Sequence, residues 1–189
     1  MTAHGTTPTP AGAGRSRWRR LWRHLWRDAR HTRRRLDDAA CARLAAAIRT
    51  SESGHLGEIR LSVEAALPPG YVWQRLTARD RALTLFGKLR VWDTEHDTGV
   101  LVYVLLAESA IEIVADRGLR RRVPPTEWDA IVEAMAARLS TGADGRPGAL
   151  EPALHEAVQR LDALLRRHWP LPDGLAANPD ELANVVDRR

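Results

Sequence analysis

The amino-acid sequence predicts a three-layer α/β/α sandwich, in which helices cover both faces of a small mixed sheet that contains a β-hairpin. Two observations lead to this class. Segments with helical and strand periodicity follow one another in the order helix, strand, helix, strand, strand, helix, helix. One of the strand segments, residues 100–107, is apolar without alternation, as a strand buried on both faces is. The predicted body spans residues 36–170.

The first half of the body contains two helices and one strand. Apolar residues recur at helical spacing from Leu36 to Ile48, which predicts the first helix. Over residues 57–65 the period changes to two, with apolar odd positions and polar even positions. This alternation predicts a strand with only one covered face, either half-covered or at the edge of the sheet. Thr77 and Asp80 resemble a capping box and predict the start of the second helix.

The second half begins with the predicted hairpin. The apolar strand turns on the two residues Glu108-Ser109 into an antiparallel strand at 110–115. Pro124-Pro125 then opens a third helix, because proline suits the first turn of a helix. A last long helix ends at residues 168–170. The Pro/Asn/Asp-rich segment 171–189 is expected to be a mobile tail.

Positive charge is concentrated ahead of the body. The net charge is +5, yet residues 1–35 contain ten arginines against one aspartate, so the remainder is net acidic. After a disordered tail at 1–14, residues 15–35 are predicted to form a basic amphipathic helix. Its apolar residues lie on one helical face: Trp18, Leu21, Trp22, Leu25 and Trp26. Its polar surface carries Arg19, Arg20, Arg23 and Arg27.

Three kinds of partner suit this basic helix, and the sequence leaves all three open. The tryptophan stripe can dock on the protein's own body or on a sister subunit, which would give a homo-oligomer. It can instead lie in a membrane interface, with indoles at the headgroups and arginines on anionic lipid. Nucleic acid is the weakest of the three, because no second basic patch or recognition fold accompanies the helix.

Composition excludes several protein classes. The single cysteine, Cys41, excludes an internal disulfide framework and a multi-cysteine zinc site. No apolar run reaches about 18 residues, so we expect no transmembrane helix. The N-terminus also lacks the apolar core of a signal peptide. Arginine almost replaces lysine, with Lys88 the only lysine, as in GC-rich bacteria. We expect a protein of the bacterial cytoplasm, or one held peripherally at the inner membrane.

Carboxylates gather at the rim of the predicted sheet. Asp93, Glu95, His96 and Asp97 precede the apolar strand, and Asp116 follows its hairpin partner. Oxygen ligands in a flexible loop suit Ca²⁺ or Mg²⁺ better than zinc. Metal-assisted phosphate chemistry would then be possible, with His96 as a ligand or general acid. The alternatives are a structural or regulatory cation, or a solvated loop that merely turns into the strand.

The sequence assigns no catalytic residue. It contains no Gly-rich phosphate loop, no nucleophile elbow and no paired-histidine metal motif. The arginines at 120–122 are expected in a loop after the hairpin, where they either hold an anion near Asp116 or are solvated.

Taken together, five segments resemble the TPM domain family, in the family's order: Gly57–Leu61, Ala82–Phe86, Asp97–Tyr103, Ile111–Leu119 and Trp128. More narrowly, the chain is similar to a small stand-alone bacterial subgroup. That subgroup has an arginine-rich leading helix, a Trp-Asp-Thr-Glu-His loop and an Asn-Pro-Asp-Glu-Leu tail, found here at 178–182.

The resemblance implies a Rossmann-like sandwich and two kinds of function. Some relatives are credited with acid phosphatase activity and bind calcium through carboxylates at the rim of the sheet. Others are non-catalytic partners of membrane complexes. Many relatives have a signal peptide and a membrane anchor, and we expect neither in this chain. It also carries Thr98 where an amide is common in the family.

From these observations we expect a non-catalytic interaction or scaffold module, associated with a membrane surface or membrane complex through its basic helix. The alternative is a divalent-metal-dependent hydrolase of the acid phosphatase kind, and binding of nucleic acid is a weaker one.

Overall fold

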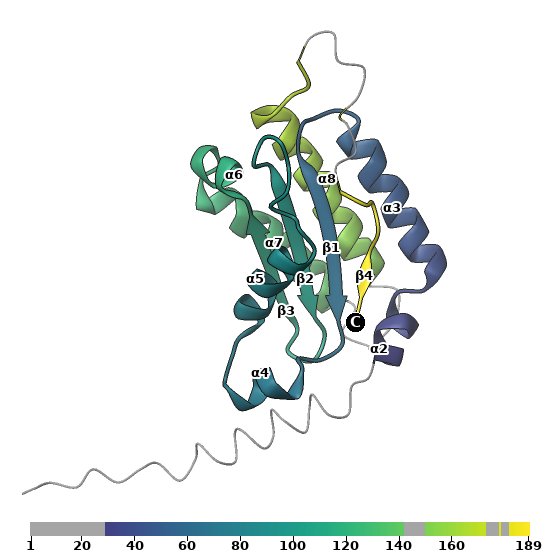
Figure 1. Ribbon diagram of the computed structural model, residues 1–189. Helices are drawn as coiled ribbons and strands as arrows, with labels where there is room; N and C mark the ends of the chain where they lie inside the picture. The colour runs from purple at the N-terminus through teal and green to yellow at the C-terminus, as the bar shows by residue number, and fades with distance from the viewer. Residues whose placement is uncertain (1–28, 142–149, 173–177, 179–181) are drawn as a thin grey trace, which may run out of the picture.

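A computed structural model describes residues 29–141, 150–172, 178 and 182–189 of the chain (Figure 1). Its centre is a four-stranded mixed sheet in the order β3-β2-β1-β4. The parallel strands are β1 (Glu58–Glu64), β2 (Gly99–Leu105) and β4 (Asp187–Arg188), with β1 paired to both of the others. The antiparallel strand β3 (Ala110–Ala115) pairs with β2 and forms one end of the sheet.

Helices cover both faces of this sheet, which confirms the predicted sandwich (Figure 1). One face carries α3 (Asp38–Glu52), α7 (Pro125–Thr141) and α8 (Leu150–His168). The other carries α4 (Pro69–Trp73) and α5 (Ala78–Lys88). Two short helices, α2 (Ala29–Arg35) and α6 (Arg117–Arg122), lie toward opposite ends of the sheet. Within the described ranges, no helix is both long enough and apolar enough to span a membrane.

Each face of the sheet has its own apolar core, and the alternation within the strands explains why. Ile59, Leu61 and Val63 of β1 pack toward α3 and α8, with Val100, Val102 and Val104 of β2 beside them. The intervening residues of β2 pack toward α5 on the other face. Strand β2 is therefore buried at every position, as its unbroken apolar sequence predicts.

The prediction of a half-covered or edge strand was wrong for β1. It lies inside the sheet between β2 and β4, and its polar face is buried. The polar side chains are buried because each has a partner in the described structure: Glu58 accepts from Asn178, Ser62 donates to Asp187, and Glu64 accepts from Arg81. Polar groups that have hydrogen-bond partners can be buried at little cost. The alternating sequence of β1 does not reveal these distant partners, so it wrongly suggests an exposed face.

The segment 182–189, part of the predicted mobile tail, packs against the sheet instead. Its strand β4 pairs with β1, and Leu182 and Val186 are buried. Beyond the strand, the Arg189 amide donates to the Val63 carbonyl at 2.9 Å, and the Arg189 carbonyl accepts from Ala65 at 2.9 Å. The expectation of mobility does not hold for these residues, because their backbone groups complete the sheet.

Two details of the hairpin region also differ from the expectation. The connection between β2 and β3 is four residues long, 106–109, since Leu105 still pairs with Ala110. The arginines at 120–122 belong to helix α6 and not to a loop. Asp116 explains the helix, because its side chain accepts the Arg117 amide hydrogen and caps the first turn.

The main helices lie where the sequence predicts them. The capping box of α5 is present, with the Asp80 amide 3.2 Å from Thr77 Oγ1 and the Thr77 amide 2.7 Å from Asp80 Oδ2. Of the predicted basic helix at 15–35, only the part from Ala29 onward, α2, falls within the described residues. The tail at 1–14 and the tryptophan stripe lie outside them.

Candidate functional site

The predicted acidic loop and the start of α6 meet at one end of the sheet, here called the rim. The Gly118 amide donates to the Asp97 carbonyl at 3.1 Å, and the Asp116 amide donates to the Gly99 carbonyl at 2.9 Å. A Cβ atom at Gly118 would lie 2.6 Å from the Asp97 oxygen, so the two backbones approach as closely as they do only because residue 118 is glycine. The rim therefore does bring Asp97 and Asp116 near each other.

Asp97 is held by an arginine of the same rim. Its Oδ2 lies 2.8 Å from Nε of Arg117, the first residue of α6. The hydrogen bond from Arg117 is the main cause that lowers the pKa of the Asp97 carboxyl below its usual range. The Asp97 backbone is left-handed, with φ of 54°, which an aspartate at a tight turn tolerates. The Asp97 carboxylate is therefore charged, and the Arg117 guanidinium already balances its charge.

The other residues of the acidic loop do not converge on Asp97. Asp93 pairs with Arg90, three residues before it. Glu95 and His96 are exposed. In the part of the chain that the structure describes, no group of three or more His, Cys, Asp or Glu side chains gathers in a metal-binding arrangement.

Asp116 is the buried member of the predicted set. It is 9% exposed, and its Oδ1 accepts the Arg117 amide hydrogen at 2.6 Å as the cap of α6. Its Oδ2 is buried and has no hydrogen-bond partner among the described residues. Buried carboxylate oxygens usually have a partner, so this atom is the strongest indication of a ligand at the rim.

Sequence reasoning missed a buried polar cluster on the α5 face. Arg81 donates to Glu64 through two hydrogen bonds, Nε to Oε2 at 2.9 Å and Nη2 to Oε1 at 2.7 Å. Tyr103 donates its hydroxyl to Glu64 Oε2 at 2.7 Å. One signal was available, since Arg81 lies three residues after Ala78 and four before Leu85, on the apolar face of α5.

This Glu64–Arg81–Tyr103 cluster ties α5 to two strands and has no access to a substrate. Burial is the main cause that raises the Tyr103 pKa, whereas the Glu64 hydrogen bonds raise the Arg81 pKa. The side chains of Arg81 and Glu64 are 7% and 5% exposed. The Arg81–Glu64 ion pair and the neutral Tyr103 hydroxyl bond one another inside the core, so the cluster is structural.

A second buried cluster contains the residue types of a serine hydrolase, at the contact of α3 with α8. Ser51 Oγ lies 2.9 Å from His55 Nε2 and donates to Asp162 Oδ1 at 2.9 Å. The Gly57 amide donates to His55 Nδ1 at 3.1 Å, so the neutral ring carries its proton on Nε2 and donates it to Ser51. A nucleophilic serine needs a histidine that accepts its proton. Here His55 donates to Ser51, and Ser51 donates to Asp162.

The histidine of this second cluster is neutral over a wide pH range. His55 has no exposed surface, and burial is the main cause that lowers its pKa to about 4. The network joins α3, α8 and the turn before β1, and we assign it a structural role.

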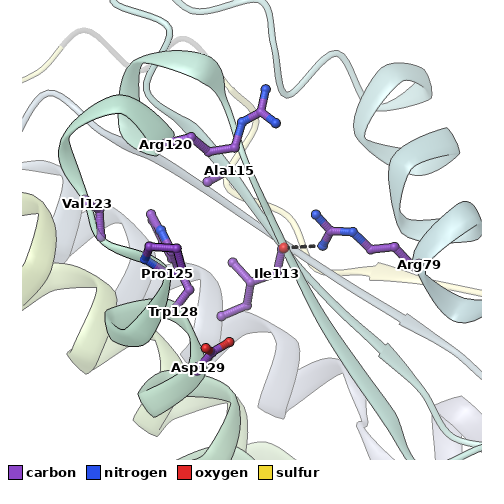
Figure 2. Close-up of a pocket in the computed structure, with 8 residues that line it drawn as sticks. All are labelled: Arg79, Ile113, Ala115, Arg120, Val123, Pro125, Trp128 and Asp129. Atoms are coloured by element: carbon purple, nitrogen blue, oxygen red, sulfur yellow. Dashed lines mark hydrogen bonds between the residues drawn. The ribbon is translucent and has the colours of Figure 1, made fainter.

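A groove of about 460 Å³ lies at the open side of β3, between α5 and α7 (Figure 2). We call it the β3-edge groove. It is lined mainly by Arg79, Ile113, Ala115, Arg120, Val123 and Trp128. Of these residues the sequence considered only Arg120, as a possible anion ligand near Asp116. The groove itself was not predicted, because it depends on which strand ends the sheet, and the sequence does not fix the strand order.

Comparisons with known proteins agree with this architecture. The family model described as the TPM domain matches residues 32–163. A similar solved structure is the NMR structure of the BA42 protein from the psychrophilic bacterium Bizionia argentinensis, with a TM-score of 0.68 and 24% sequence identity. The match covers 80% of this chain and 94% of that one, and at this identity it shows the fold alone. None of the curated proteins compared with the chain is a match.

Proposed function

The chain belongs to the TPM domain family, and from this premise we propose that it is a non-catalytic interaction or scaffold module. The observation that carries the proposal is the pairing at the rim. Asp93 and Asp97 each hold an arginine of the same chain, and Asp116 is used as a helix cap. These carboxylates are directed to separate partners, whereas a metal-dependent hydrolase needs several that converge on one ion.

The partner that we propose is an anionic membrane surface, or a membrane complex, reached from the bacterial cytoplasm through the basic helix. Support comes from the sequence: the tryptophans Trp18, Trp22 and Trp26 share one face, and arginines surround them. A helix of this composition binds by burying its apolar face and by attracting anionic lipid.

Vesicle co-sedimentation tests this partner with the full chain. We expect pelleting with phosphatidylcholine vesicles that contain phosphatidylglycerol, and weak pelleting with phosphatidylcholine alone. Replacing Trp18, Trp22 and Trp26 by alanine should abolish most of the binding. The control replaces Trp73 and Trp92, two tryptophans of the folded body that are 68% and 50% exposed, and should leave binding unchanged.

The alternative partners give different results in the same set of variants. A stripe that docks on the body or on a sister subunit predicts that the triple variant lowers the melting temperature or the oligomeric mass. Binding of nucleic acid predicts an affinity for duplex DNA that falls steeply with salt and requires the basic helix.

One observation favours a second candidate function, a divalent-metal-dependent phosphatase. The unpartnered Oδ2 of Asp116 lies at the rim beside Asp97, and oxygen donors of this kind fit Ca²⁺ or Mg²⁺. Asp93, Glu95, Asp97, Asp116 and His96 are the residues that would hold the ion. Asp97 would first have to release Arg117. A bound ion would neutralise phosphate oxygens at this rim.

A thermal shift measurement separates the two functions. The phosphatase predicts a melting temperature that rises with CaCl₂ or MgCl₂, and no rise when Asp93, Asp97 and Asp116 are replaced by alanine. It also predicts metal-dependent hydrolysis of p-nitrophenyl phosphate that the triple variant lacks. Asp129→Ala, at an exposed position on α7, is the control for the loss of a surface carboxylate. The interaction module predicts no hydrolysis in any variant.

A further inference from the structure

The outer side of β3 presents backbone groups that no strand of the described structure pairs. Strand β3 ends the sheet, and its residues bond β2 alternately. The Asp116 amide bonds Gly99, so Val114 and Glu112 face β2 in the same way, and Ile113 and Ala115 direct their amide and carbonyl groups outward. An edge whose backbone groups are not paired with another strand can accept one.

An arginine occupies the middle of that edge. Arg79 Nη1 of α5 lies 2.5 Å from the Ile113 carbonyl oxygen and 3.5 Å from Glu112 Oε2 (Figure 2). The side chain of Arg79 is 45% exposed, and its contact with Glu112 is exposed whereas its contact with the Ile113 carbonyl is partly buried. An incoming strand that offers the carbonyl another N–H donor can therefore replace Arg79 at modest cost. Arg79 therefore blocks the edge in a way that an incoming strand can reverse.

The two sides of the β3-edge groove differ in chemistry. Figure 2 shows Arg79 on one side of β3, with Pro125 and Trp128 on the other. Arg120 of α6 stands near the Ala115 end, is exposed, and its side chain has no partner among the described residues. Asp129 lies beside Trp128, so an acidic group is repelled on that side and attracted on the side of Arg79.

We propose that the β3-edge groove binds an extended acidic segment of a partner protein, which adds a strand to β3. Side chains of an added strand alternate between the two faces of the sheet. Acidic residues would then lie beside Arg79, and apolar residues at alternate positions would pack on Pro125 and Trp128. The amide of the incoming strand replaces the Arg79 guanidinium on the Ile113 carbonyl, and the released guanidinium pairs with the acidic side chain.

Charge favours this occupant over the chain's own segments. The predicted basic helix is strongly positive and would meet Arg79 and Arg120 with like charge. The proposal goes beyond the proposed function, because it concerns a different surface and holds whether or not the chain binds membranes.

Fluorescence anisotropy with the full chain tests the proposal. The probe is a labelled octapeptide of alternating aspartate and valine. Two control peptides have alternating lysine and valine, or the same aspartates and valines in two blocks. The block peptide measures non-specific attraction to the basic helix, which every variant retains. We expect the alternating acidic peptide to bind at least tenfold more tightly than either control.

Variants on the two sides of the groove sharpen the test. Arg79→Glu and Arg120→Glu should each weaken binding about tenfold, and Asp129→Asn should strengthen it severalfold. The matched control is Arg49→Glu, the same charge change at an exposed position of α3, which packs on β1 and α8 away from the β3 end of the sheet, and it should leave binding unchanged. Hydrogen exchange at the amides of Ile113 and Ala115 should slow when the peptide binds, whereas that of Val114 should not change.

Three outcomes would overturn the proposal. The first is equal binding of the block and alternating acidic peptides, and the second is equal weakening by Arg49→Glu and Arg79→Glu. The third is a dimer in light scattering that Arg79→Glu dissociates, which would assign the groove to a second copy of the chain.

Discussion

Glu64 on β1 and Arg81 on α5 form a two-pronged ion pair inside the protein, with both hydrogen bonds at 2.9 Å or less. Glu64 lies on the polar face of β1, which the alternating sequence predicts to be exposed to solvent. It is the clearest case in this molecule of polar residues that hold the sandwich together from within, and it leads to the first prediction.

Breaking this pair on one side should destabilise the protein strongly. Glu64→Gln and Arg81→Met should each lower the free energy of unfolding by about 3–5 kcal/mol, because each leaves a charged or polar partner buried alone. The double variant should lose less than the sum of the two. Urea denaturation measures all three. Arg79→Met, which breaks the exposed pair with Glu112, is the control and should cost about 1 kcal/mol or less.

Stability should depend on pH through His55. Its pKa is about 4 in the folded protein and 6.5 when unfolded, so the unfolded state binds more protons between these values. Stability is therefore fully present above pH 6.5 and falls as the pH drops toward 4, by about 3 kcal/mol for this group. His55→Gln should flatten the profile in that window. An unchanged slope would show that other groups cause the dependence.

Two glycines of the chain should respond in opposite ways to alanine. A Cβ atom at Gly99 would lie 1.8 Å from the Val91 carbonyl oxygen, so Gly99→Ala should cost about 3 kcal/mol and displace the rim loop. Gly87, in α5, has open space around it, and Gly87→Ala should raise stability by about 0.5–1 kcal/mol. Thermal unfolding compares the two variants. Similar losses for both would mean that the rim is less tightly packed than we describe.

The C-terminal residues should contribute to stability as part of the core. Leu182 is 8% exposed, and its amide lies 3.4 Å from Glu58 Oε2. Leu182→Ala should therefore cost about 2–3 kcal/mol in chemical denaturation. Val185, three residues on, is 56% exposed, and Val185→Ala should change stability by less than about 0.5 kcal/mol. A freely moving tail would give no loss for either residue.

The sequence predicts the sandwich and its main helices because those depend on local signals. The stripe of α8, the capping box of Thr77 and the unbroken apolar run of β2 each fix an element without distant contacts. The strand order, the pairing of β4 with β1 and the burial of Glu58 and Glu64 depend on contacts across more than a hundred residues or between separate elements. No local pattern encodes such contacts.

The same difference between local signals and distant contacts explains how much of the rim the sequence predicts. Spacing places Asp93, Asp97 and Asp116 near the ends of two strands, and the structure does bring Asp97 beside the start of α6. The sequence could not show that Arg90 and Arg117 pair with two of these carboxylates. It also could not show that the edge of β3 is open and lined by Arg79 and Trp128, because that requires the strand order.

We propose that this TPM domain protein acts by contact at a membrane surface. Co-sedimentation of the full chain with phosphatidylglycerol-containing vesicles tests it most directly. We expect the chain to pellet with the vesicles, and we expect the variant in which alanine replaces Trp18, Trp22 and Trp26 to stay in the supernatant. Equal pelleting of both proteins, or none of either, would contradict it.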